Sequence, residues 1–187
     1  GFSVAVVRNI YDNTKKLKFL NFLCNIYLTV IRGTPVVVQL LIIYFVIFSS
    51  VRIDKSFAAI LTFGINSGAY QAEIFRSGIN SVPKGQMEAG RSLGFSYPQT
   101  MINIIMPQAI KNVLPTLANE FIVLMKETSV AGYIALEDLT KAGDVIRSKT
   151  YSAMMPFLAV ALLYLIMVML FSYLVKLLER RLARSGR

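Results

Sequence analysis

The chain has 187 residues, of which 55% are hydrophobic and only 16% are charged, whereas a soluble globular domain carries about 25% charged residues. Its apolar residues form long blocks, as in membrane-spanning proteins, and its length fits a single domain, residues 1–187. The net charge of +10 agrees with basic cytoplasmic loops, and because no basic and aromatic face lies outside the blocks, we expect no nucleic-acid partner.

The sequence also excludes several kinds of chemistry. It contains no histidine and one cysteine, Cys24, so an intrachain disulfide and a cysteine metal cage are impossible, and the commonest metal ligand and general base are missing. The phosphate-binding pattern G-x-x-x-x-G-K-[ST] does not occur. We therefore expect no catalytic residues, no metal and no cofactor on this chain.

Five transmembrane helices are expected, with the first largely absent from this sequence. Residues 1–7 are apolar but too short to cross a bilayer, so we interpret them as the end of the first span. Residues 19–50 form the second, interrupted at Arg32-Gly33-Thr34-Pro35, where Pro35 lacks a backbone N–H and disfavours helix at Thr34. The third, fourth and fifth spans are residues 57–79, 110–133 and 153–175. The chain is therefore predicted to be an all-α membrane protein.

The third span carries small and polar residues, which must face other helices or a polar cavity because they are costly in lipid. Gly64 and Gly68 are four residues apart, a spacing that lets two helices approach closely. Glu73 and Arg76 are three apart, so they are positioned to pair with each other.

The distribution of basic residues predicts the orientation. Three alternate loops, at residues 8–18, 76–111 and 176–187, hold four, four and five Lys and Arg residues. The opposite loops hold two and four, and acidic residues offset the latter. Basic residues are retained on the cytoplasmic side, so we expect the N-terminus outside, with the missing helix restored, and the C-terminus in the cytoplasm.

The polar region 81–108 has clear helix boundaries. Ser81 can cap a helix that has Pro83 near its first position and runs from Lys84 to Leu93. Gly94 supplies a left-handed stop. Ser96 then caps a second helix, expected to run from Tyr97 to Met106, where Pro107 perturbs it.

Taken alone, this region resembles the helix–turn–helix of DNA-binding repressors. Flanking membrane spans argue against that interpretation, and the second helix offers mainly Tyr, Gln, Thr and Asn where a recognition helix needs a polar or basic face. A protein-docking loop fits better.

The same region carries a family motif. Glu88-Ala89-Gly90, then Gly94, then Ile104-Ile105-Met106-Pro107, resembles the EAA loop of ABC importer permeases, EAA-x3-G-x9-I-x-L-P, in spacing at every position. Gly90 stands where the pattern has Ala and Met106 where it has Leu, and we expect Gly90 only to loosen the helix by about 1 kcal/mol. Further stretches resemble the polar and basic amino-acid branch of the family (histidine, glutamine and arginine permeases): residues 32–45, 66–86, 106–129 and 178–184.

The resemblance implies a type I ABC importer transmembrane domain in a bacterial inner (plasma) membrane. Its coupling residues would be Glu88, Ala89, Gly90, Gly94 and Pro107. They would dock on a cytoplasmic ATP-binding subunit, present in two copies, which holds ATP and Mg²⁺. A second permease copy, as a homodimer, and an extracytoplasmic solute-binding protein complete the expected assembly.

Ligand-binding residues are expected where polar groups interrupt the apolar spans. Glu120 lies in an apolar run, where an unpaired charge demands a cation; that cation is either a cationic amino acid or an internal partner such as Lys126, Arg76 or a neighbouring subunit. Lys126 either binds an α-carboxylate or extends to the membrane interface. The candidates are Asn66, Ser67, Tyr70, Asn119, Glu120, Lys126 and Glu127.

The predicted function is therefore that of a non-catalytic permease subunit that imports a polar, cationic amino acid such as arginine, lysine or histidine. Two alternatives remain open: an importer of neutral or amide amino acids such as glutamine, and an ion-coupled secondary transporter. The secondary transporter would have no use for a docking helix–turn–helix. A membrane-anchored DNA-binding regulator would require DNA affinity that falls steeply with salt.

Overall fold

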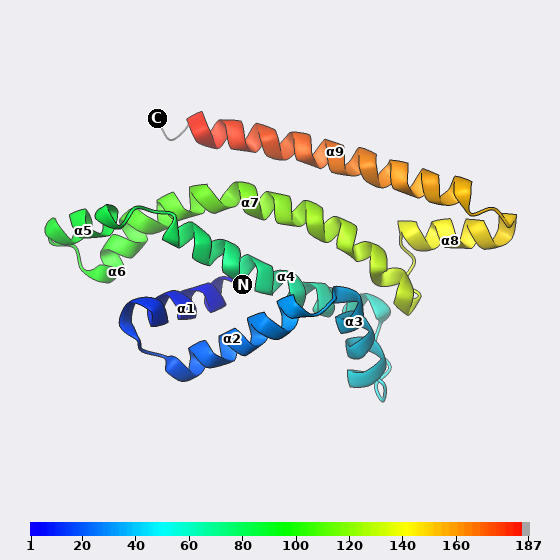
Figure 1. Cartoon of the computed structure of the whole chain (residues 1–187), viewed down its shortest axis with the longest axis horizontal. Coiled ribbons are helices and arrows are strands. Elements are labelled where there is room, and N and C mark those ends of the chain that lie inside the picture. Colours follow the sequence, from blue (N-terminus) through cyan, green and yellow to red (C-terminus); the bar gives the residue numbers. More distant parts are fainter. Residues whose placement is uncertain (185–187) are drawn as a thin grey trace.

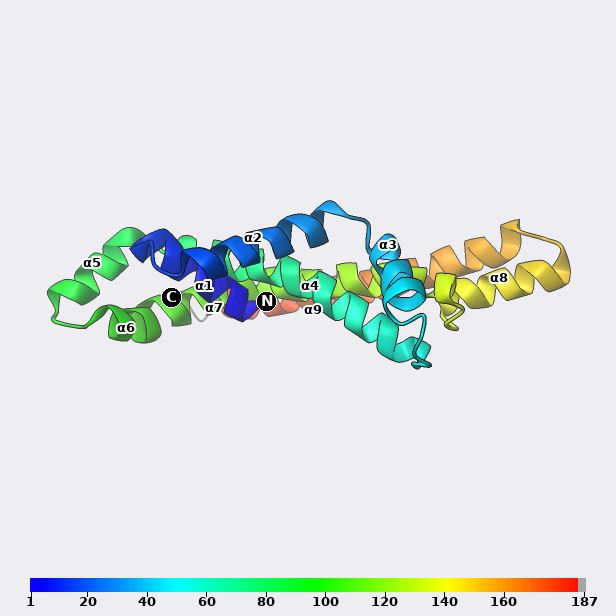
Figure 2. The same cartoon turned by 90° about the horizontal axis from the view of Figure 1, so that it is seen from below.

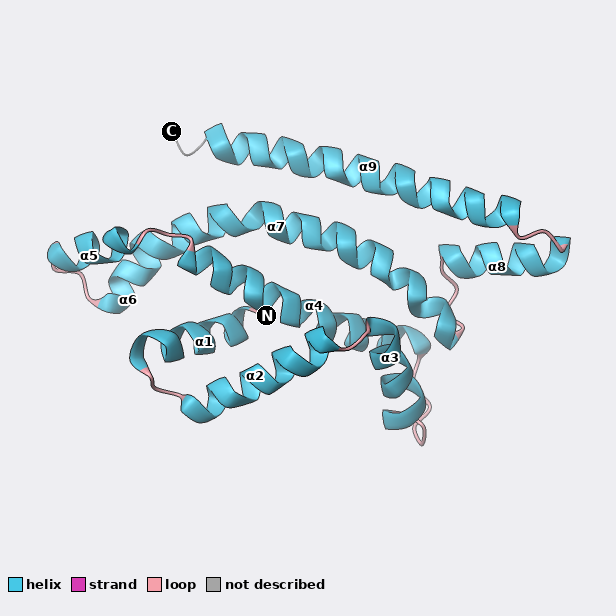
Figure 3. Ribbon diagram, viewed as in Figure 1, coloured by secondary structure: helices cyan, strands magenta, loops and turns pink. Residues whose placement is uncertain are grey.

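The computed structural model describes residues 1–184, and every regular element in that part of the chain is a helix (Figures 1 and 3), which confirms the all-α fold. The elements are α1 (Phe2–Thr14), α2 (Lys18–Gly33), α3 (Val36–Leu41), η1 (Ile42–Ile47), α4 (Lys55–Asn80), α5 (Lys84–Ser92), α6 (Tyr97–Thr100), η2 (Met101–Ile105), α7 (Met106–Glu127), η3 (Thr128–Ile134), α8 (Leu139–Thr150) and α9 (Met154–Arg184). The π-helical elements are η1 and η2, and η3 is a 3₁₀ helix. The molecule is elongated, with α5 and α6 at one end and α8 at the other (Figure 2).

Helices α4 and α7 pack side by side at the centre of the fold (Figure 1). Gly78 permits this contact, because a Cβ there would lie 2.0 Å from Val113 Cγ1 and 3.3 Å from the Ala109 carbonyl oxygen. The glycines expected to mediate helix packing behave differently. Gly64 has no atom within 4 Å of a Cβ position, and Gly68 meets only the Tyr27 hydroxyl, at 3.1 Å, and the Gly1 nitrogen.

The amino-terminal hairpin of α1 and α2 packs against α4 (Figure 1). Helix α1 extends beyond the apolar residues 1–7, through Arg8, to Thr14. Its charged residues explain this extension, because Arg8 pairs with Glu73 and Asp12 pairs with Arg76 at 2.9 Å, both on α4. The expected pairing of Glu73 with Arg76 is present as well, at 3.8 Å.

The predicted break in residues 19–50 is confirmed: α2 and the α3–η1 segment meet at an angle of 106°. The side chain of Gln39, on α3, binds the backbone groups that the break leaves without helical partners. Its side-chain amide donates hydrogen bonds to the carbonyl oxygens of Ile31 (2.7 Å) and Thr34 (3.0 Å) and to the Thr34 hydroxyl (2.8 Å). Helix ends need such partners in a membrane, where water cannot supply them.

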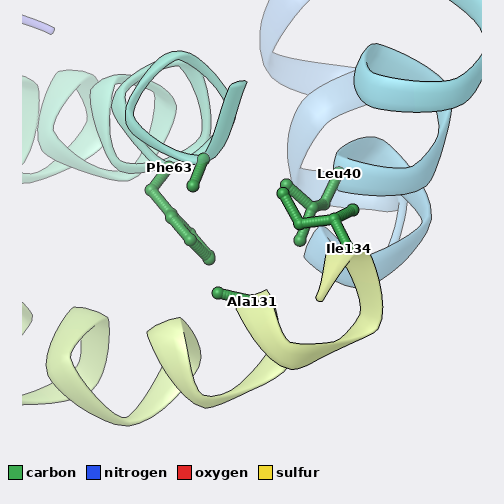
Figure 4. Packing of buried hydrophobic residues seen from close by; sticks show 5 residues of the cluster. Leu40, Phe63, Ala131 and Ile134 are labelled. Atoms are coloured by element: carbon green, nitrogen blue, oxygen red, sulfur yellow. The ribbon is translucent and has the colours of Figure 1, made fainter. Parts of the chain in front are cut away.

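A small apolar core joins α3, α4 and η3. Leu40, Phe63, Ala131 and Ile134 are all buried and converge from the three elements (Figure 4). This core holds α3 and η3 against α4. Asp54 caps the start of α4 nearby, where its carboxylate accepts a hydrogen bond from the Ser56 N–H. This bond lowers the pKa of Asp54, and a hydrogen bond from the Ser56 side chain lowers it further.

The carboxyl-terminal part consists of α8 and α9, which lie against each other (Figure 1). The expected polar segment after η3 contains α8, and Asp138 caps the start of this helix. Gly143 lets α9 approach α8 closely, because a Cβ at this position would lie 2.7 Å from Val160 Cγ2. In α8, hydrogen bonds from Arg147 and then Lys141 lower the pKa of Asp144.

Helix α9 is long and apolar enough to cross a membrane: the most apolar 18-residue stretch within Met154–Arg181 has a mean hydropathy of 2.6, and none of that stretch is buried within the chain. Among the described residues, only the bent pair of α2 with α3–η1 meets the same standard of length and hydropathy. Helix α9 runs past the expected end at residue 175, through the basic residues, to Arg184. Arg187, counted in the carboxyl-terminal basic cluster, lies outside the described residues.

Candidate functional site

The predicted cytoplasmic loop forms a helical hairpin, which we call the α5–α6 hairpin (residues 84–100). Gly94 ends α5 with a φ of +89°. The Phe95 N–H donates to the Gly90 carbonyl at 3.2 Å, and the Gly94 N–H donates to the Arg91 carbonyl at 3.1 Å. These two bonds make a Schellman motif, so the predicted left-handed stop is confirmed.

The start of the second helix is also as predicted. Ser96 caps it through a capping box: its hydroxyl accepts from the Gln99 N–H, and the Gln99 side chain accepts from the Ser96 N–H. The start of α5 differs from prediction, because Pro83 occupies the N-cap position and the Ser81 hydroxyl instead donates to the Gly78 carbonyl. Ser81 therefore does not cap α5.

The expected end of the second helix at Pro107 is wrong. The chain continues from α6 through the π-helical turn η2 directly into α7, and Pro107 lies in the first turn of α7. A proline is tolerated there because the first N–H groups of an α-helical segment need no intrahelical acceptor. The α5–α6 hairpin is thus connected to α7 by uninterrupted helical structure (Figure 3).

Gly90 has a larger role than expected from its low helix propensity. It is buried, and a Cβ would lie 2.5 Å from Thr100 Cγ2 and 2.9 Å from Ile104 Cδ1. Gly90 therefore allows α5 to pack closely against α6 and η2. Glu88 and Ala89 are exposed on the hairpin, as is Pro107, and so remain accessible for a partner.

The second candidate site is a cavity of about 560 Å³ between the end of α2, the second half of α4 and residues 112–120 of α7. We call it the charged groove. It runs from the level of Arg32 and Glu120 to Ser81 at the base of the α5–α6 hairpin. Its side chains able to bind a polar ligand include Arg32, Tyr70, Glu73, Asn112, Thr116 and Glu120.

The groove offers charges of both signs to a ligand. The guanidinium of Arg32 lies over the ring of Tyr70, 5.5 Å from its centroid. Glu73 is already engaged by Arg8 and Arg76. Within the described residues, Glu120 forms no ion pair, so the internal partners considered for it, Lys126 and Arg76, do not neutralise it.

The structure separates the seven expected ligand residues. Tyr70 and Glu120 line the charged groove. Asn66 is buried beside the α2–α3 break, where its amide donates to Gln39 Oε1 at 3.1 Å. Ser67 lines a different cavity on another face of α4, of about 640 Å³. Asn119, Lys126 and Glu127 are not part of the groove lining.

Three groove residues were not identified from the sequence. Arg32 lies at the predicted interruption of the second span, and a charged residue beside a helix break was the one sequence signal that could have identified it. Asn112 and Thr116 lie on the same face of α7 as Glu120, at spacings of four residues, which is the helical signal that could have identified them. Asn112 also donates to the Ser81 hydroxyl at 2.9 Å.

Broken and apolar helices around a groove that contains charges define a class, the helical membrane-transport subunit. Residues 3–184 match the family described as binding-protein-dependent transport system inner membrane component. The chain belongs to this family. Membership confirms the permease assignment and the inner-membrane location.

Relatives of known name are similar over most of the chain. The glutamine transport system permease protein GlnP of Escherichia coli (strain K12) is 41% identical over 165 residues, covering 87% of this chain and 75% of the relative. A putative glutamine transport system permease protein GlnP of Rickettsia typhi is 39% identical over 165 residues, covering 87% and 76%.

Two solved structures share the fold. The crystal structure of an amino acid ABC transporter with histidines superposes with a TM-score of 0.86 at 40% identity, covering 96% of this chain and 84% of that chain. An inward-facing conformation of the MetNI methionine ABC transporter gives a TM-score of 0.79 at 18% identity, covering 97% and 85%. The latter likeness concerns the fold alone.

Proposed function

We propose that this chain is the permease subunit of an ATP-driven importer of polar amino acids, with glutamine as the substrate. The relatives named above are glutamine permeases. Their names support the amide alternative over the cationic amino acid that Glu120 suggested, so glutamine replaces arginine, lysine or histidine as the proposed substrate.

The observation that carries the proposal is the pairing of opposite charges in the charged groove. A zwitterionic amino acid presents an α-carboxylate and an α-ammonium group. Arg32 suits the carboxylate because guanidinium binds it through parallel hydrogen bonds, and Glu120 suits the ammonium group. Asn112 and Thr116 offer an amide and a hydroxyl for the polar side chain of the ligand.

In this proposal α4, α7, α9 and the bent α2–α3 pair cross the membrane, with the loop between α1 and α2, the α5–α6 hairpin and the end of α9 in the cytoplasm. Two ATP-binding subunits, which hold ATP and Mg²⁺, dock on the hairpins of this chain and of a second permease copy. Because the hairpin continues into α7, which lines the groove, movement of the hairpin changes access to Glu120. A binding protein delivers the ligand from outside.

Equilibrium binding to the purified complex of permease and ATP-binding subunit tests the substrate. Radiolabelled glutamine should bind without the binding protein, and unlabelled arginine should displace it at least tenfold less well than unlabelled glutamine. Stronger displacement by arginine would restore the cationic assignment. Glutamine accumulation in vesicles that lack nucleotide and the ATP-binding subunit would instead favour an ion-coupled transporter.

Replacing Gly94 with valine should uncouple ATP hydrolysis from transport. A β-branched residue at this positive φ is strained by about 1–3 kcal/mol, so the Schellman turn is lost and the hairpin is displaced. We expect the ATPase stimulation by ligand-loaded binding protein to fall severalfold, while glutamine binding in the groove persists. Gly85→Val is the matched control, because a Cβ at Gly85 meets no atom within 4 Å; equal losses in both variants would contradict the prediction.

A further inference from the structure

We infer that Gln39 and Asn66 form a positioning pair, which fixes Arg32 for the ligand's α-carboxylate. This inference rests on the proposed function, because it takes Arg32 as the carboxylate-binding group of the charged groove. Neither Gln39 nor Asn66 lines that groove. Their effect on the ligand is therefore exerted through the backbone on which Arg32 is carried.

The hydrogen bonds of Gln39 enclose the last turn of α2. Its amide nitrogen binds the carbonyl oxygens of Ile31 and Thr34, which flank Arg32 and Gly33 in the chain. Helix α2 ends at Gly33, and Thr34 is already extended, so these carbonyls have left the helical ladder. Gln39 thus fixes the backbone immediately before and after Arg32.

Asn66 fixes Gln39 in turn. Its side-chain nitrogen donates to Gln39 Oε1 at 3.1 Å, which orients the Gln39 amide with its nitrogen toward α2. The exposed fractions are 8% for Gln39 and 3% for Asn66, so water does not replace these bonds when one partner is removed. A chain of bonds therefore runs from α4, through α3, to the end of α2.

Arg32 itself is held only lightly. It is exposed, and its described contact is with the ring of Tyr70. The ring keeps the guanidinium close to its face but offers no carboxylate or carbonyl oxygen as a hydrogen-bond acceptor. A side chain with several rotatable bonds binds a carboxylate well only if its backbone is fixed, since an unfixed one loses more entropy on binding. The amide pair supplies that restraint.

The test compares two ligands, glutamine and its decarboxylated counterpart 4-aminobutanamide, on the purified complex of permease and ATP-binding subunit. The dissociation constant of 4-aminobutanamide divided by that of glutamine is the ratio of interest, and it measures recognition of the α-carboxylate alone. Gln39→Met keeps the length of the side chain but removes the amide, and we expect the ratio to fall at least tenfold. Gln71→Met is the matched control: Gln71 lies on α4, binds Ser67 at 3.1 Å and lines the other cavity, and its replacement should leave the ratio unchanged.

A double-mutant cycle with Arg32→Gln separates positioning from general damage. If Gln39 acts through Arg32, Gln39→Met should lower the ratio in the presence of Arg32 and have no further effect in the Arg32→Gln background. Additive effects, or equal weakening of both ligands by Gln39→Met, would overturn the inference.

Failure of the inference can be distinguished from failure of the proposed function. An unchanged ratio in Arg32→Gln alone would refute both, whereas a lowered ratio there with an unchanged ratio in Gln39→Met refutes only the positioning role. If Gln39→Met does not assemble, Asn66→Leu provides the same test from the other end of the pair, since it removes only the donor to Gln39 Oε1. Its expected result is a severalfold fall in the ratio, and an unchanged ratio would overturn the inference.

Discussion

Replacing Glu120 with glutamine should weaken the binding of glutamine by about 10- to 100-fold. The substitution keeps the size of the side chain and removes the one carboxylate of the charged groove that forms no ion pair in the described part of the chain. A hydrogen bond between charged groups contributes about 1.5–3 kcal/mol, and each 1.4 kcal/mol corresponds to a factor of ten in affinity. Equilibrium binding of radiolabelled glutamine to the purified complex measures the loss.

Glu127→Gln is the control for this prediction. Glu127 lies seven residues further along α7, carries the same charge and is not part of the groove lining. It should retain affinity within about twofold of the original protein. Unaltered binding in Glu120→Gln would contradict its assignment to the ammonium group, and reduced assembly with normal binding would indicate that Glu120 pairs with a neighbouring subunit.

The sequence predicts those parts of the fold that depend on local patterns. The break at Pro35, the left-handed stop at Gly94 and the Ser96 cap each follow from the chemistry of one residue and its neighbours, and all are present. The fifth apolar block is a helix for the same reason. It runs further than expected because its basic end, up to Arg184, also has good helix formers.

Features that depend on distant contacts were not predictable in this way. Pro107 indicates a helix end when taken locally, but the π-helical turn before it lets the helix continue. Arg8 belongs to a basic stretch that favours a loop, whereas its partner Glu73, 65 residues away, holds it in α1.

The groove was found only in part for the same reason. Tyr70 and Glu120 are noticeable because they are polar residues within apolar spans. Arg32 lies at the edge of a span, where a basic residue is ordinary, and only the folding of α2 against α4 brings it over Tyr70. Asn66 carries the same signal as Tyr70, but its amide is used by Gln39 across the break.

Gly78→Ala should destabilise the permease although alanine is the better helix former. The gain in helix propensity is about 1 kcal/mol, whereas the added methyl group would lie 2.0 Å from Val113 Cγ1 and 3.3 Å from a backbone oxygen. Overpacking of this kind costs about 1–3 kcal/mol or more, and here the backbone must also move because α4 and α7 are in contact. We expect the melting temperature of the detergent-purified complex to fall by several degrees.

The sign of the effect should reverse at Gly64, on the same helix. A Cβ at Gly64 meets no atom of this chain within 4 Å, so Gly64→Ala should keep the gain in helix propensity and hold or raise the melting temperature. Adding Val113→Ala to Gly78→Ala removes the closer of the two clashing atoms and should recover part of the loss. Equal destabilisation at Gly78 and Gly64, without rescue, would show that α4 is limited by contacts outside this chain rather than by its packing against α7.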